Sequence, residues 1–144
     1  MEDKIISILK KKKPIPERTL QVIEKVGVDT GSSVFGGYIE GKSDIDILIP
    51  PDSLSYDELI VEGYGIYTNE DYDEDGYMSM YVKTEEDIIL NLLICLDDEA
   101  FDIRVKVTKI LERLYKFELG YLLEFKGNRC LLFETLIEIL KKGK

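Results

Sequence analysis

Residues 31 to 49 read GSSVFGGYIEGKSDIDILI and contain the most informative feature of the chain. In its second half two aspartates, Asp44 and Asp46, alternate with isoleucines. Because successive side chains of an extended strand point to opposite faces, we expect both carboxylates on one face and the isoleucines on the other. Paired carboxylates beside a glycine-rich turn are a ligand set for a divalent cation that also contacts phosphate oxygens. We therefore predict a strand with a Mg²⁺ or Mn²⁺ site at Asp44 and Asp46.

The same alternation has a simpler interpretation, which applies to any isolated string of this kind. An edge strand or a half-solvated strand turns acidic residues to water and apolar residues to the core. The Gly/Ser turn upstream of the aspartates is the feature that favours a site over this interpretation.

Together, the turn and the aspartate pair resemble the signature of the DNA polymerase beta-like nucleotidyltransferase superfamily, and most closely its small stand-alone members. In that signature a Gly-Ser pair ends the first strand, a glycine follows four residues after the serine, and Asp-x-Asp begins eleven residues after it. Ser33, Gly37, Asp44 and Asp46 keep this spacing, while Ser32 stands where the family has glycine.

The resemblance implies a protein that binds a Mg-nucleoside triphosphate and transfers a nucleotidyl group to a hydroxyl acceptor, such as a protein, a nucleotide or an RNA end. Asp44 and Asp46 would hold the metal. The family's turn commonly carries an arginine, which this chain lacks, so Lys42 and backbone amides are left to contact the phosphates. The residues expected around the triphosphate are Ser32, Ser33, Gly36, Gly37 and Lys42.

The family also has a third carboxylate, on a strand beside the Asp-x-Asp strand. Here the candidate strand is residues 87–96, DIILNLLICL, which places Asp87 and Asn91 on one face, with Asn91 as the aligned position. An amide cannot take a proton from an attacking hydroxyl, so Asn91 either orients the metal or acceptor, or marks the loss of catalysis.

Two expectations about function therefore stay open. The first is an active nucleotidyltransferase. The second is a catalytically inactive, acidic protein of the same fold that binds and inhibits a basic, nucleic-acid-handling protein. The Asn-Leu pair in this strand and the C-terminal stretch RCLLFETL are similar to virus-encoded relatives, which would place the protein in the host cytoplasm.

Composition limits the other function classes. The 144 residues carry a net charge of -10, which opposes nonspecific nucleic-acid binding. The absence of histidine excludes imidazole ligands and Ser-His or Cys-His nucleophiles. No apolar run reaches the roughly 18 residues of a membrane span, and Cys95 and Cys130 lie among apolar neighbours. We expect one cytoplasmic domain over residues 1–144, with no membrane partner and with both cysteines reduced in the core.

Periodicity predicts an α+β fold, with a mixed β-sheet of the nucleotidyltransferase type flanked by helices and a helical part over about residues 98–144. Gly127 and Asn128 are expected in a loop between the last two helices. In the acidic segment 69–76, NEDYDEDG, the aspartates repeat the opening of a calcium-binding EF-hand loop, but the closing position is Val82 rather than glutamate. An exposed acidic turn is the preferred interpretation of that segment.

Overall fold

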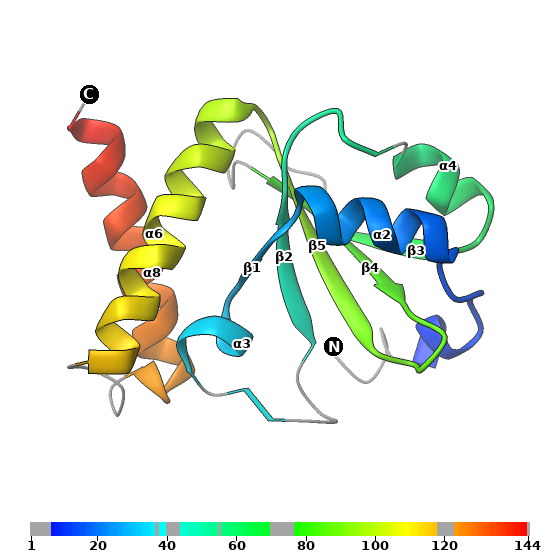
Figure 1. Ribbon diagram of the computed structural model, residues 1–144, viewed down its shortest axis with the longest axis horizontal. Helices are drawn as coiled ribbons and strands as arrows, with labels where there is room; N and C mark the ends of the chain where they lie inside the picture. The colour runs from blue at the N-terminus through cyan, green and yellow to red at the C-terminus, as the bar shows by residue number, and fades with distance from the viewer. Residues whose placement is uncertain are drawn as a thin grey trace.

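A five-stranded sheet in the order β1-β2-β5-β4-β3 forms the centre of the fold (Figure 1). The structure is a computed structural model that describes residues 7–36, 38–39, 44–54, 56–69, 77–117 and 123–143. β2 and β5 run parallel, and the other neighbouring strands run antiparallel. The strands are β1 (Val28–Thr30), β2 (Ile45–Ile49), β3 (Gly65–Asn69), β4 (Tyr77–Lys83) and β5 (Ile89–Cys95). The fold is therefore α+β with an open mixed sheet, as predicted.

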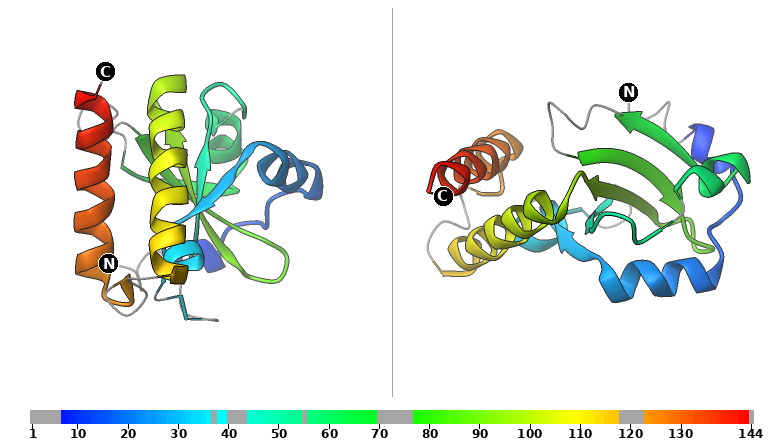
Figure 2. Two further views of the ribbon diagram at one scale, coloured as in Figure 1. Left: turned by 60° about the vertical axis from the view of Figure 1, so that its left-hand side comes forward. Right: turned by 90° about the horizontal axis from the view of Figure 1, so that it is seen from above.

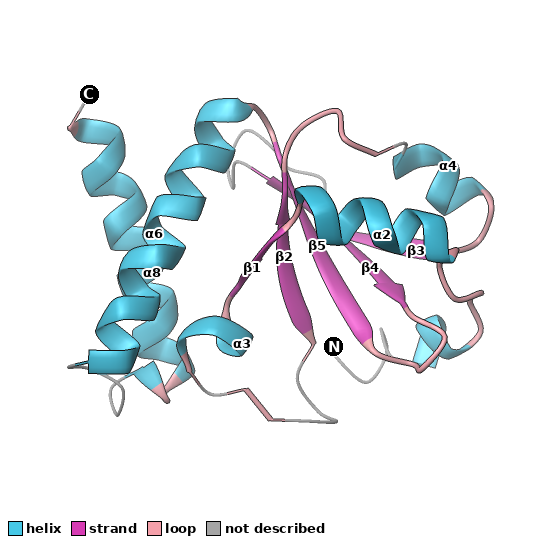
Figure 3. Cartoon of the chain, in the orientation of Figure 1, coloured by secondary structure: helices cyan, strands magenta, loops and turns pink. Residues whose placement is uncertain are grey.

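Helices alternate with the first three strands, β4 and β5 follow β3 in the order of elements, and two helices come last (Figure 3). They are α2 (Glu17–Val26), α3 (Ser32–Phe35), α4 (Tyr56–Val61), α6 (Asp98–Phe117) and α8 (Lys126–Lys142). None of the helices in the described part of the chain is long and apolar enough to cross a membrane.

One face of the sheet carries the main apolar core. Alternate residues of the central strands point to this face and pack against α2 and α4, because the pleat sends every second side chain to the same side. The buried members are Ile15, Ile23, Ile47, Ile49, Leu59, Met80, Val82, Leu90, Leu92 and Ile94. Asp46 and Asn91 belong to the opposite set of residues, which also includes the fully buried Leu48.

A second apolar cluster lies beyond the β1 edge of the sheet, where α6 and α8 run side by side (Figure 2). Its buried members are Phe35, Ile103, Val107, Leu111, Leu123 and Ile137. Phe35 in α3 brings the Gly/Ser turn into this cluster, where its ring stacks on Phe133 with centroids 6.1 Å apart. The turn is thus fixed from one side by the helices and from the other by β1.

A buried pair of hydroxyl groups joins β1 to α6. Thr108 Oγ1 donates to the carbonyl oxygen of Arg104 at 2.8 Å, and it lies 2.7 Å from Thr30 Oγ1. Because the Thr108 hydroxyl donates its proton to the carbonyl oxygen of Arg104, the Thr30 hydroxyl is the donor in the contact between the two threonines. This contact holds Thr30, the strand neighbour of Asp46, in a fixed position.

Several sequence predictions differ from the structure near the C-terminus. Gly127 and Asn128 lie inside α8, which begins at Lys126, because Arg129 Nη1 donates to the carbonyl oxygens of Leu123 and Glu124 and orders the entry to the helix.

Cys130 is exposed and not part of the core, whereas Cys95 is buried as expected. The NEDYDEDG segment lies almost wholly outside the described residues.

Candidate functional site

Three neighbouring strands place a row of polar side chains on one face of the sheet. Asp46 in β2 pairs in register with Thr30 in β1 and with Asn91 in β5. In-register neighbours share a face, so Thr30, Asp46 and Asn91 project together, away from the main core. The predicted side-by-side arrangement of the Asp-x-Asp strand and the strand of Asn91 is therefore present in the fold.

Asn91 contacts Asp46 directly. Its Nδ2 atom donates to Asp46 Oδ1 at 3.1 Å. Its Oδ1 atom is buried and has no hydrogen-bond partner among the described residues. Buried polar atoms are nearly always paired, so this acceptor beside a carboxylate is a place where a water molecule, an ion or a ligand can bind.

Asp87, the other polar candidate on this segment, lies outside the site. β5 begins only at Ile89, and Asp87 is exposed in the preceding turn with a positive φ of 61°. Its carboxylate lies 3.5 Å from the ammonium group of Lys83. The strand boundary thus leaves Asn91 as the residue that stands opposite Asp46.

The Asp44 and Asp46 side chains act on each other electrostatically. Burial, the negative charge of Asp44 and a hydrogen bond with the Asp44 carboxyl group together raise the pKa of Asp46 from its ordinary value of 3.8 to about 7. The hydrogen bond from Asn91 and the positive charge of Lys126 act in the opposite direction. The pair therefore holds a proton near neutral pH, and a divalent cation at the same place would substitute for that proton.

The Gly/Ser turn places its backbone against the aspartates. Gly31 caps α3 with a positive φ of 71°, and a β-carbon at this position would collide with the Asp46 carboxylate. Ser32 begins α3, and Ser33 Oγ donates to the carbonyl oxygen of Thr30 at 3.3 Å. Gly31 is thus the glycine that the site requires, although the spacing of the sequence pattern drew attention to Ser32.

The other residues that were predicted to contact phosphate either pack against the helical part or lie outside the described residues. Gly36 is buried with a φ of 122°, and a β-carbon there would lie 2.8 Å from the carbonyl oxygen of Leu123 and 2.8 Å from Tyr115. Packing against the helical part explains this glycine. Gly37 and Lys42 lie outside the described residues.

Lys126 is a residue that the sequence analysis missed. Its charge reaches Asp46 from the first turn of α8, eighty positions further along the chain (126 against 46). No local pattern in the sequence could have indicated this, because the proximity arises only when α8 folds back along α6.

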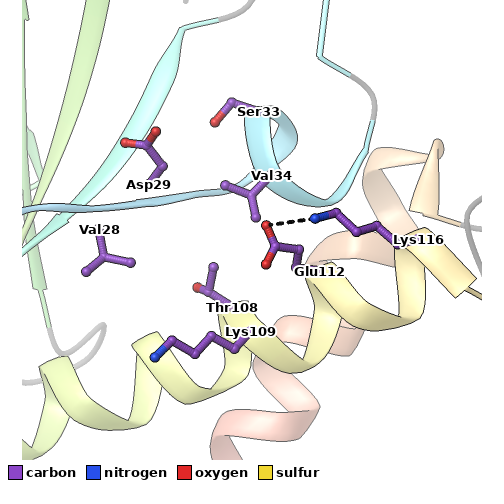
Figure 4. Close-up of a pocket in the computed structure, with 8 residues that line it drawn as sticks. All are labelled: Val28, Asp29, Ser33, Val34, Thr108, Lys109, Glu112 and Lys116. Carbon is purple, nitrogen blue, oxygen red and sulfur yellow. Dashed lines mark ion pairs between the residues drawn. The ribbon is translucent and has the colours of Figure 1, made fainter.

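A surface pocket of about 480 Å³ borders the turn between β1, α3 and α6 (Figure 4). Its lining includes Ser33 and Val34 from the turn and Lys109, Glu112 and Lys116 from α6. Figure 4 shows the Lys116 ammonium group paired with Glu112, at 3.8 Å. Asp29 also lines the pocket, so its two lysines are balanced by two carboxylates and the pocket has no net charge to attract a triphosphate.

Comparison with known proteins does not identify the chain: no protein-family model matches it, and neither the curated proteins nor the solved structures that were searched contain a match. In the described part of the chain, no group of three or more acidic or cysteine side chains is arranged to hold a metal. The oxygen-bearing groups gathered on this face of the sheet are the Asp44 and Asp46 carboxylates and the Asn91 amide.

Proposed function

We propose that this protein is a nucleotidyltransferase-like protein that binds a Mg-nucleoside triphosphate at Asp44 and Asp46. The observation that carries the proposal is the contact between Asp46 and Asn91, with a carboxylate at Asp44 beside it and a buried Asn91 Oδ1 that has no partner among the described residues. Two carboxylates and an amide oxygen fit Mg²⁺ or Mn²⁺, which prefer oxygen ligands and leave positions for phosphate and water.

The order of the elements supports the same proposal. The Gly/Ser turn follows β1 directly, β1 and β2 are antiparallel neighbours, and β5 lies beside β2. This is the order that the superfamily resemblance implies for a Gly-Ser turn, an Asp-x-Asp strand and a third site strand. A bound metal ion would neutralise phosphate charge and orient the triphosphate. The backbone of residues 31–33 would approach the phosphates, because Gly31 leaves room beside Asp46.

Calorimetric titration with ATP, GTP, CTP and UTP tests this function. We expect at least one triphosphate to bind in the presence of Mg²⁺ and to lose that binding when EDTA removes the metal. Mg²⁺ alone should bind more weakly at pH 6 than at pH 8, because the proton held by the aspartate pair competes with it. A protein that binds none of the four nucleotides with either Mg²⁺ or Mn²⁺ would contradict the proposal.

A second candidate function is a catalytically silent acidic protein that binds and inhibits a basic, nucleic-acid-handling protein. The observation that favours it is Asn91, because an amide stands where the resemblance implies a carboxylate. Glu85 and Glu86 are exposed in the turn before β5, and the whole chain has a net charge of -10. Clustered carboxylates attract basic surfaces over long range.

The two functions differ in their response to salt and to mutation. For the acidic binder we expect capture of a basic partner that weakens steeply as salt rises and that Asp44→Ala leaves unchanged. Partner binding that is insensitive to salt, or that Asp44→Ala removes, would count against this candidate.

A further inference from the structure

We infer that this site holds its Mg-nucleoside triphosphate as a ligand and does not consume it, because Asn91, the side chain that contacts Asp46, cannot accept a proton. The inference rests on the proposed function and concerns what happens after the nucleotide binds. It assigns Asn91 as a positioning residue, which orients Asp46 through its amide group and offers its carbonyl oxygen to the bound ligand.

The contacts of Asn91 define this role. Its Nδ2 atom donates to Asp46 Oδ1 at 3.1 Å, which fixes the orientation of the carboxylate. Because that nitrogen is used, the side chain turns its Oδ1 atom into a buried position without a partner in the described part of the chain. A carbonyl oxygen in this position can accept a hydrogen bond or ligate a cation, but it has no basicity for a proton transfer.

Nucleotidyl transfer requires such a proton transfer. The acceptor oxygen forms a bond to the α-phosphorus, the bond from the α-phosphorus to the bridging oxygen breaks, and pyrophosphate leaves with that oxygen. The proton of the acceptor hydroxyl must go to a base within hydrogen-bond reach. Without a base the acceptor attacks as a neutral hydroxyl, and the reaction is slow.

The neighbouring groups among the described residues do not supply the base. Tyr81 of β4 stands in register with Asn91 on this face, and a phenol keeps its proton at neutral pH. The chain has no histidine. Asp29 belongs to the opposite face of β1, where it pairs in register with Ile47, and Asp87 lies in the turn before β5 beside Lys83. The Thr30 hydroxyl is directed to Thr108. Asp44 and Asp46 themselves are the carboxylates that would hold the metal.

The test measures binding and turnover in the same three proteins: wild type, Asn91→Asp, and the control Gln21→Glu. The control adds the same charge at an exposed position of α2, on the other side of the sheet. The probe is a Mg-nucleoside triphosphate with water as the acceptor, and the products are nucleoside monophosphate and pyrophosphate. Binding is followed by calorimetry, and pyrophosphate release by a coupled assay.

We expect wild type and Gln21→Glu to bind the nucleotide and to release pyrophosphate at the background rate. Asn91→Asp should release pyrophosphate at least ~100-fold faster, because a positioned general base contributes about 10²- to 10⁴-fold. A merely structural role of Asn91 would alter thermal stability in this variant but would not create turnover.

Two results would overturn the inference. One is turnover by wild type above background at saturating nucleotide, a measurement that does not depend on how well the variant folds. The other is a folded Asn91→Asp protein that binds Mg-nucleotide and gains no turnover. In both cases nucleotide binding stands, whereas absence of binding by wild type contradicts the proposed function itself.

Discussion

Replacing Asp44 and Asp46 together by alanine should abolish Mg-dependent triphosphate binding while the protein remains folded. The two carboxylates would supply the charge that offsets dehydration of a bound metal ion, and loss of even an outer-shell partner of a metal ligand reduces affinity by roughly 10- to 100-fold. Removing both ligands should therefore weaken binding by more than ~100-fold in the titration. Unchanged affinity in the double variant would rule out this site.

The matched single variant Asp46→Asn separates loss of the site from loss of the fold. Burial raises the pKa of Asp46 to about 7, so between pH 4 and 7 the folded protein binds more protons than the unfolded chain. The stability of the metal-free wild type should thus fall as pH rises through this range, by roughly 2 to 4 kcal/mol in total. Asparagine has almost the same shape and no charge to bury, so the variant should escape this loss.

Chemical denaturation at pH 5 and pH 8 measures the effect. Wild type and Asp46→Asn should differ little at pH 5, and the variant should be the more stable protein at pH 8. Adding Mg²⁺ at pH 8 should stabilise wild type and leave the variant unchanged, since a ligand that binds only the folded state raises its stability. If the variant is less stable than wild type at pH 8, burial of the charged Asp46 carboxylate does not destabilise the folded wild type.

The sequence predicted the parts of the site that depend on local periodicity. Alternation along residues 44–49 put both aspartates on one face, and alternation along residues 87–96 put Asn91 on a site face together with Asp87, which the structure leaves outside the strand. Neither of these two predictions depends on distant parts of the chain, because the pleat of a strand alone decides to which face a side chain points. The register that sets Asp46 opposite Asn91 is a property of strand pairing, and the structure supplies it.

The features that the sequence could not provide come from long-range packing. The charge of Lys126 acts on Asp46 only because α8 folds back along α6. Ile110 of α6 and Cys130 of α8 are exposed because they lie outside the faces on which the two helices pack. Ile103 and Val107 are buried in α6, whereas Ile110 of the same helix is exposed. Helical periodicity identifies an apolar stripe along the helix, but it does not show which residues of that stripe pack against another element.

Gly36→Ala should destabilise the fold strongly, although the sequence pattern placed this glycine near phosphates. Its φ of 122° with ψ of 150° lies in a region that only glycine adopts readily, which costs about 1–3 kcal/mol for another residue. The new β-carbon would also lie 2.8 Å from the Leu123 carbonyl oxygen and 2.8 Å from the Tyr115 ring. Overpacking of this kind costs a further ~1–3 kcal/mol. We therefore expect a loss of roughly 2 to 6 kcal/mol.

Gly127→Ala is the control for this substitution. Gly127 lies in the first turn of α8, and a β-carbon there meets nothing within 4 Å, so alanine should leave stability unchanged or raise it by up to about 1 kcal/mol. Thermal unfolding should separate the two variants by roughly 10 °C or more. Because Gly36 links the Gly/Ser turn to the α6 and α8 cluster, its variant should also weaken nucleotide binding by loosening the backbone beside Asp46. A Gly36→Ala protein as stable as wild type would mean that the turn does not depend on the helical part for its position.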